Sequence, residues 1–130
     1  MKIAMPVSEK SIDSYINNTF GRANYFLIYD TESESSVFID NTAAASQGGA
    51  GISAAQILVD QNIDSLITPR CGKNSAEVFE NSNIKLYRSI AGAIKENIEL
   101  LKEGKLNELT EIHAGFHGVG RNNNRGRGRR

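Results

Sequence analysis

The sequence of 130 residues contains a single cysteine, Cys71, and no long run of apolar residues. One thiol excludes an internal disulfide framework and a zinc or cluster site built only from the cysteines of one chain. The apolar stretches, such as residues 25–29, fall far short of the roughly 20 residues that cross a bilayer. The first residues lead directly into a strand-like run, without the apolar segment of a signal peptide. We therefore expect a cytoplasmic protein that does not enter a membrane.

Acidic residues are absent from the last part of the chain. All 15 acidic residues precede residue 113, whereas five of the 15 basic residues are arginines among residues 121–130. The formal net charge of zero therefore combines an acidic body with a basic tail. This division argues against a nucleic-acid-binding body with a basic face, and it confines any such role to weak, salt-sensitive contacts of the tail.

The composition is typical of one folded domain followed by a tail. Hydrophobic residues make up 39% of the sequence and charged residues 23%, which is typical of globular proteins rather than disordered or fibrous ones. The length allows one domain of ordinary size. The chain ends in glycine, asparagine and arginine, which bury little surface. We therefore expect a folded domain over residues 1–105 and a disordered tail over residues 106–130.

Hydrophobic patterning predicts a mixed sheet with helices packed on its faces. The clearest helix is the last one, which Gly104 should end. Its apolar positions are Ile90, Ile94, Ile98 and Leu101. Two strands joined by a short polar loop predict an antiparallel hairpin, and the later alternation of helices and strands predicts parallel crossover units. The predicted strands are residues 2–7, 25–30, 36–40, 65–68 and 84–87, and the predicted helices are residues 52–62, 75–81 and 89–103.

Three short motifs occur in order along the predicted domain. Residues 20–23 read Phe-Gly-Arg-Ala before an aromatic strand, residues 49–56 open a helix, and residues 63–68 precede a Gly-Lys-Asn-Ser turn. In this order and spacing the motifs resemble the dinitrogenase iron–molybdenum cofactor biosynthesis family, which includes NifX-like carriers and the C-terminal domain of NifB. The resemblance covers residues 1–105, nearly the whole predicted domain.

This resemblance implies both a fold and a function. The fold would be ribonuclease-H-like, with a three-layer α/β/α arrangement around a mixed five-stranded sheet and without nuclease activity. The function would be non-enzymatic: binding or carriage of an iron–sulfur or iron–molybdenum-type cluster, or its precursor, in exchange with a cluster donor or acceptor protein. Two positions depart from the family pattern, because Thr19 replaces a frequent histidine and Cys71 replaces a frequent aliphatic residue.

Positive side chains occur where an anionic cluster would bind. In open α/β folds the ligand crevice lies beyond the carboxyl ends of the parallel strands. Arg22 precedes one predicted strand, and the turn after another contains Arg70, Gly72 and Asn74. These residues would supply positive charge and backbone donors, and the turn precedes a helix whose free N–H groups favour anions. The alternative for Arg22 is structural, with bonds to loop carbonyls or to Asp30.

Three residues are candidates for direct metal coordination. Cys71 is the only soft ligand in the sequence, and its thiolate would suit iron or cuprous copper. The positive end of the following helix should lower the pKa of the Cys71 thiol and so favour the thiolate. One thiolate cannot hold a cluster alone, so this hypothesis requires a homodimer that shares the site or a labile, transferable cluster. A small hydrophobic residue in a turn is the alternative. His113 and His117 have the spacing of a helical metal site, but nearby glycines disfavour a helix and favour incidental histidines in a tail.

Two other kinds of site are disfavoured by the sequence. The glycines of residues 48–51 lack the Gly-Lys-Ser/Thr ending of a P-loop, so a flexible loop is the simpler interpretation. The carboxylates Asp30, Asp40, Asp60 and Asp64 do not converge from central strands, as a two-metal nuclease site requires. The leading hypothesis is therefore a metallocluster carrier. The alternative is a regulatory or interaction domain without a metal in its body, whose basic tail contacts RNA or an acidic partner.

Overall fold

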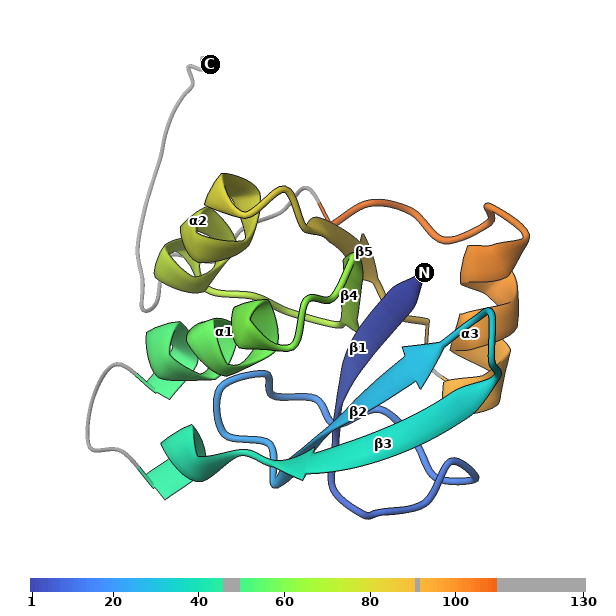
Figure 1. The fold of residues 1–130 in the computed structure, drawn as a ribbon, viewed down its shortest axis with the longest axis horizontal. Coiled ribbons are helices and arrows are strands. Elements are labelled where there is room, and N and C mark those ends of the chain that lie inside the picture. Colours follow the sequence, from blue (N-terminus) through green and yellow to red (C-terminus); the bar gives the residue numbers. More distant parts are fainter. Residues whose placement is uncertain (46–49, 91, 110–130) are drawn as a thin grey trace.

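A computed structural model describes residues 1–45, 50–90 and 92–109 (Figure 1). Strands and helices follow one another in the predicted order, with one added 3-10 helix after the hairpin. The elements are β1 (Lys2–Val7), β2 (Tyr25–Asp30), β3 (Ser35–Asp40), the 3-10 helix η1 (Thr42–Ala45), α1 (Ala50–Asp60), β4 (Ser65–Thr68), α2 (Lys73–Asn81), β5 (Lys85–Arg88) and α3 (Ile94–Lys102). No helix of the described ranges has the length and apolarity of a membrane span.

The five strands form one mixed sheet in the order β3-β2-β1-β4-β5. β1 pairs antiparallel with β2, from Lys2 opposite Asp30 to Val7 opposite Tyr25. β2 and β3 form the predicted antiparallel hairpin. β4 lies parallel to both β1 and β5, and the α2 crossover connects β4 with β5. The predicted mixed five-stranded sheet is confirmed.

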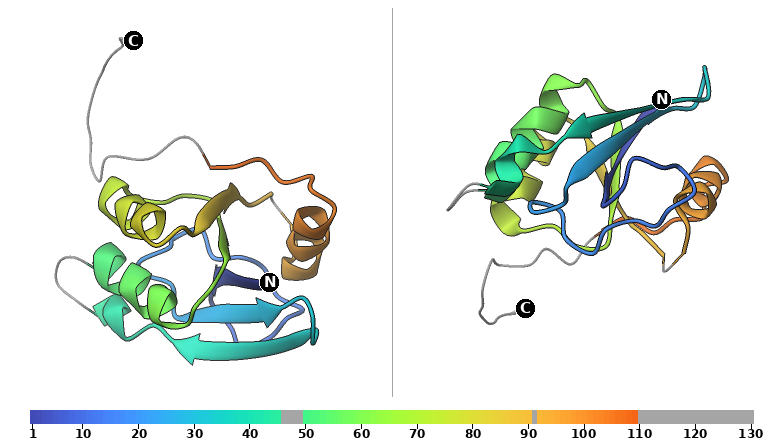
Figure 2. Two further views of the ribbon diagram at one scale, coloured as in Figure 1. Left: turned by 45° about the horizontal axis from the view of Figure 1, so that its top comes forward. Right: turned by 90° about the horizontal axis from the view of Figure 1, so that it is seen from below.

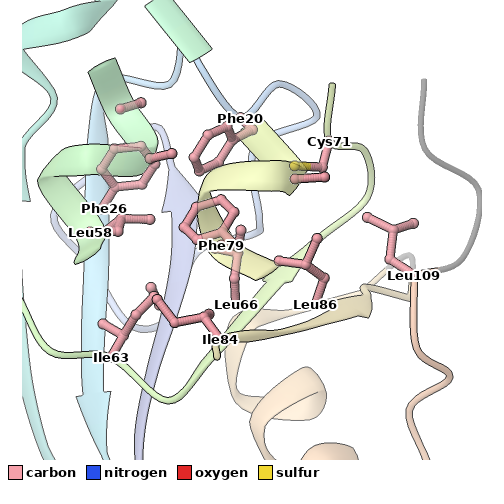
Figure 3. Packing of buried hydrophobic residues seen from close by; sticks show 14 of the residues in the cluster. Phe20, Phe26, Leu58, Ile63, Leu66, Cys71, Phe79, Ile84, Leu86 and Leu109 are labelled. Atoms are coloured by element: carbon pink, nitrogen blue, oxygen red, sulfur yellow. The ribbon is translucent and has the colours of Figure 1, made fainter. Parts of the chain in front are cut away.

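Helices cover both faces of this sheet, with α1 and α2 on one side and α3 on the other (Figure 2). Successive strand residues point to opposite faces, so neighbouring residues of β1 enter different cores: Ala4 packs beneath α1 and α2, whereas Ile3 and Met5 pack against α3. The expected three-layer α/β/α arrangement is therefore confirmed. The larger side chains in the core beneath α1 and α2 include Phe20, Phe26, Leu58, Leu66 and Phe79 (Figure 3).

Helix α3 begins at Ile94, so the predicted start near residue 89 is wrong. The reason is Asn97, whose side chain is fully buried. Its Oδ1 accepts the Ile90 N–H at 2.8 Å, and its Nδ2 donates to the Ala93 carbonyl at 3.0 Å. Ala93 is therefore held in an extended conformation and forms a bridge with Tyr15. The predicted inward position of Ile90 is also wrong, because this side chain is 38% exposed outside the helix.

The other two helices differ from their predictions in detail. α1 begins at Ala50, two residues before the predicted start, and buries the small residues Ala50 and Ala54 together with Leu58, spaced four apart, whereas Ile52 is 44% exposed. α2 begins at Lys73 instead of Ser75, because Gly72 serves as the N-cap residue with an extended backbone. The β4–α2 turn is therefore shorter than the sequence predicts.

The chain continues to pack against the sheet after α3. Gly104 ends the helix as predicted, with a positive φ of 73° that glycine adopts readily. Leu106 and Leu109 are buried, and the Leu109 N–H donates to the Leu86 carbonyl of β5 at 2.9 Å. The outer edge of β5 is thereby covered by residues 107–109.

Candidate functional site

The candidate site lies where the connections after β1 and β4 diverge. After β1 the chain turns towards β2 on one side of the sheet, and after β4 it turns towards β5 on the other. In open α/β sheets a ligand crevice forms at such a switch point, beyond the carboxyl ends of the strands. A cavity of about 390 Å³ occurs here, between residues 18–22, the start of α1 and the β4–α2 turn.

Two glycines allow the three walls of this cavity to approach closely. A Cβ atom on Gly21 would lie 3.0 Å from both Cα and N of Gly51, and one on Gly51 would lie 2.6 Å from Oγ of Ser75. The first contact is tighter than most real Cβ contacts, and the second would force the Ser75 side chain to move. The lack of side chains at positions 21 and 51 therefore lets residues 18–22, the first turn of α1 and the first turn of α2 approach closely without displacing one another.

The segment that carries Arg22 is held by one aromatic anchor and one amide. Phe20 is buried, with its ring centroid 5.4 Å from that of Phe26 and 5.6 Å from that of Phe79. The buried Asn41 side chain donates from Nδ2 to the Gly21 carbonyl at 3.0 Å and to the Ala23 carbonyl at 2.9 Å. Arg22 follows an anchored backbone, and its own side chain is exposed.

Among the residues that the structure describes, those lining the cavity carry positive charge only. Arg22 and Arg70 both line it, and none of the described lining residues is acidic. α2 also begins here, with no side-chain hydrogen bond from its N-cap residue Gly72 and no acidic residue in its first turn. Helix N-termini with free N–H groups attract anions. The buried Thr68 hydroxyl donates to the Arg70 carbonyl at 2.9 Å and so fixes the turn.

Cys71 lines the cavity and also belongs to the core beneath α1 and α2 (Figure 3). Its side chain is 2% exposed. Burial raises the pKa of the thiol to about 12, so the expectation that the helix N-terminus lowers this pKa is wrong. The physical reason is that the loss of hydration disfavours the charged thiolate. At neutral pH the site therefore presents a protonated thiol.

The structure brings together four of the predicted site residues: Arg22, Arg70, Cys71 and Gly72. Asn74 is exposed in the first turn of α2 and is not part of the cavity lining. His113 and His117 lie outside the described residues. Ser75, which was not among the predicted site residues, also lines the cavity and is buried. Its signal in the sequence is weak, since a serine in a polar turn is usually exposed.

Three of the aspartates that could suggest a nuclease site divide between the two ends of β1. Asp30 pairs with Lys2 at the amino end of β1, and Asp64 accepts the Lys2 N–H at this same end. Asp40 lies opposite Tyr25, near the carboxyl end of β1. Among the residues that the structure describes, no three histidine, cysteine, aspartate or glutamate side chains form a group that could hold a metal ion.

A larger cavity of about 550 Å³ lies within the loop of residues 8–18. Its walls carry the carboxylates of Glu9 and Asp13, and none of the described residues that line it is an arginine or a lysine. It contains none of the predicted site residues. Its charge does not suit an anionic ligand, so the smaller cavity remains the candidate.

Comparisons with known proteins agree with this architecture. An uncharacterized protein of Methanocaldococcus jannaschii is 29% identical over 112 residues, which cover 84% of this chain and 92% of the relative. The apo form of the orange protein from Desulfovibrio gigas has the same fold, with a TM-score of 0.80 and 23% identity over 84% of this chain and 92% of that chain. The structure of a NifB-like protein from Thermotoga matches with a TM-score of 0.74 and 34% identity, covering 92% of this chain and 98% of that chain.

The sequence also matches a family model over almost the whole described part. This model, described as dinitrogenase iron-molybdenum cofactor, matches residues 1–104. The matched range includes all five strands, all three α-helices and the residues that line the candidate cavity. The chain therefore belongs to the dinitrogenase iron-molybdenum cofactor family.

Proposed function

We propose that this protein is a non-enzymatic carrier that binds an anionic iron–sulfur-type cluster, or a precursor of the iron–molybdenum cofactor. The proposed binding place is the cavity between residues 18–22 and the β4–α2 turn. The observation that carries the proposal is the lining of this cavity, in which the described residues include Arg22, Arg70 and the uncapped start of α2 but no carboxylate. Family membership supports the chemical class of the cargo.

The donor set favours a cargo held by charge and hydrogen bonds. Within the described ranges no group of three potential metal ligands occurs, and the Cys71 thiol is buried with a raised pKa. Guanidinium groups and helix N–H groups, in contrast, donate to sulfide, oxo or carboxylate atoms on the outside of a cluster. Such a cluster would keep its own bridging ligands, and Cys71 would serve mainly as part of the apolar wall.

Binding of this kind suits transfer between proteins. A cluster held by charge and hydrogen bonds can leave without the breaking of covalent metal–protein bonds. The side chains of Arg22 and Arg70 are also exposed. A donor or acceptor protein could therefore reach the cargo at the cavity mouth. This mode of binding does not need a thiolate from a second copy of the chain, so it does not require the homodimer that a shared Cys71 site would need.

Anaerobic reconstitution tests the proposal directly. The full chain is incubated with iron and sulfide, with and without molybdate, and is then desalted. Bound iron, sulfide and molybdenum are counted, and the absorbance spectrum is recorded. We expect bound metal and sulfide with charge-transfer absorbance, and removal of the metal by a chelator without denaturation.

Two sets of variants locate the cargo. The double variant Arg22→Ala/Arg70→Ala should lose most of the bound metal, with its folding checked by thermal unfolding. The double variant His113→Ala/His117→Ala tests direct coordination by the tail and should keep the metal. Absence of bound metal in the parent protein, or equal metal in the parent and the arginine variant, would overturn the proposal.

A further inference from the structure

Ser75 is a buried polar residue whose hydroxyl has no protein partner in the described ranges. It lies in the first turn of α2, is 4% exposed, and lines the candidate cavity. None of the hydrogen bonds within the described part involves its Oγ atom. Buried hydroxyl groups nearly always find a partner, because a missing hydrogen bond costs stability. A buried hydroxyl that lines a cavity and has no partner among the described residues is therefore a candidate for contact with a ligand.

The neighbouring backbone keeps this hydroxyl accessible. A Cβ atom at residue 51 would lie 2.6 Å from Ser75 Oγ, so any side chain there would collide with the hydroxyl. Gly51 leaves the space open at the junction of α1 and α2. Ser75 also lies one turn from Gly72, whose carbonyl accepts the Ala76 N–H at 2.9 Å as the first bond of α2. Ser75 thus belongs to the same first turn as the uncapped N–H groups of this helix.

We propose that Ser75 donates a hydrogen bond from Oγ to the bound anion and favours an inorganic oxo- or sulfido-anion that presents an acceptor atom to the start of α2. This inference rests on the proposed function, because it assigns a donor within the same cavity. Arg22 and Arg70 supply charge at the exposed side of the cavity. Ser75 adds a neutral, directional donor at its buried side, where little water competes for the acceptor.

The proposal predicts two effects of opposite sign for one substitution. Ser75→Ala removes the hydroxyl with almost no change in volume. Without ligand, the variant should be at least as stable as the parent, because an unpartnered buried hydroxyl is removed. In the presence of the anion it should bind about tenfold more weakly or worse, since a hydrogen bond to a charged group is lost. A structural serine would give the reverse, with lower stability and unchanged binding.

The experiment uses two probes and one matched control. Ser53→Ala is the control, because Ser53 is an exposed serine of α1. This substitution changes the helix propensity by the same amount as Ser75→Ala. Thermal unfolding of the full chain is measured without ligand and over a series of inorganic phosphate concentrations. Retention of iron and sulfide after anaerobic reconstitution is measured in parallel for the parent, Ser75→Ala and Ser53→Ala.

The outcomes separate this inference from the proposed function. Weaker phosphate stabilisation or weaker cluster retention in Ser75→Ala alone, with an equal or higher melting temperature without ligand, supports the role of Ser75. Equal binding by the parent and Ser75→Ala overturns it and leaves the carrier function intact. A parent that binds phosphate through Ser75 but retains no iron or sulfide would refute the carrier function and keep the anion site. A lower melting temperature of ligand-free Ser75→Ala also overturns the inference.

Discussion

Replacement of Arg70 by alanine should weaken binding of an anionic cluster without unfolding the domain. The Arg70 side chain is exposed, and no hydrogen bond or ion pair joins its guanidinium to another residue of the described part. Its backbone carbonyl is held by Thr68, an interaction that the substitution leaves in place. Exposed substitutions of this kind usually change stability by less than about 0.5 kcal/mol. The effect of Arg70→Ala should therefore appear in binding.

The size of the effect follows from the chemistry and exposure of the guanidinium. A hydrogen bond to a charged group contributes about 1.5–3 kcal/mol, and about 1.4 kcal/mol changes an equilibrium constant tenfold. The dissociation constant would therefore rise by roughly 10- to 150-fold. Because Arg70 is exposed, water and salt screen its charge, and we expect the lower end of this range. Arg70→Lys should recover part of the affinity, since an ammonium keeps the charge but not the paired donors.

The assay is an anaerobic titration with the reconstituted cluster, followed by absorbance at low and moderate salt. Lys105→Ala is the matched control, because it removes an exposed positive charge that lies 3.4 Å from Glu103, after α3. Equal weakening by Lys105→Ala would mean that net charge, and not the cavity, attracts the cluster. An unchanged affinity of Arg70→Ala would refute the placement of the cargo beside the β4–α2 turn.

Four further tests address Cys71 and Gly21 at the site and Asn97 in α3. Burial raises the pKa of the Cys71 thiol to about 12, so the native protein should resist iodoacetamide at pH 8, and rapid native alkylation would contradict this. The free energy of unfolding, relative to Cys71→Ala, should fall from about pH 9 towards pH 12, because the unfolded chain ionises the thiol first. Gly21→Ala places a Cβ 3.0 Å from the Gly51 backbone and should lower the free energy of unfolding, measured by urea titration, by about 1–3 kcal/mol. An unchanged urea midpoint would show that the backbone at Gly51 shifts to accommodate the methyl group. Asn97→Leu leaves the Ile90 N–H without its acceptor and should cost about 1–3 kcal/mol, and a melting temperature equal to that of the parent would argue against this role.

The sequence predicts those site residues whose position follows from the order of strands and turns. Arg22, Arg70 and Gly72 were expected together, because residues beyond the carboxyl ends of parallel strands meet at one edge of a sheet. The protonation of Cys71 could not be predicted, because it depends on how deeply the turn packs into the core. Ser75 was missed for a similar reason, since its burial arises from the close approach of α1 through Gly51.

Local sequence patterns were enough to predict which segments become strands and in what order strands and helices follow. Alternating and continuous apolar patterns act over a few residues, so β2 and β4 have the bounds that their patterns predict. The start of α3 depends instead on contacts with a distant segment, because Ala93 forms a bridge with Tyr15 and the Ile94 N–H donates to the Ser14 carbonyl. The shape and charge of the cavity depend on such contacts too, since three segments far apart in the sequence must meet there. Such contacts depend on packing across the whole sheet, which no local pattern of residues encodes.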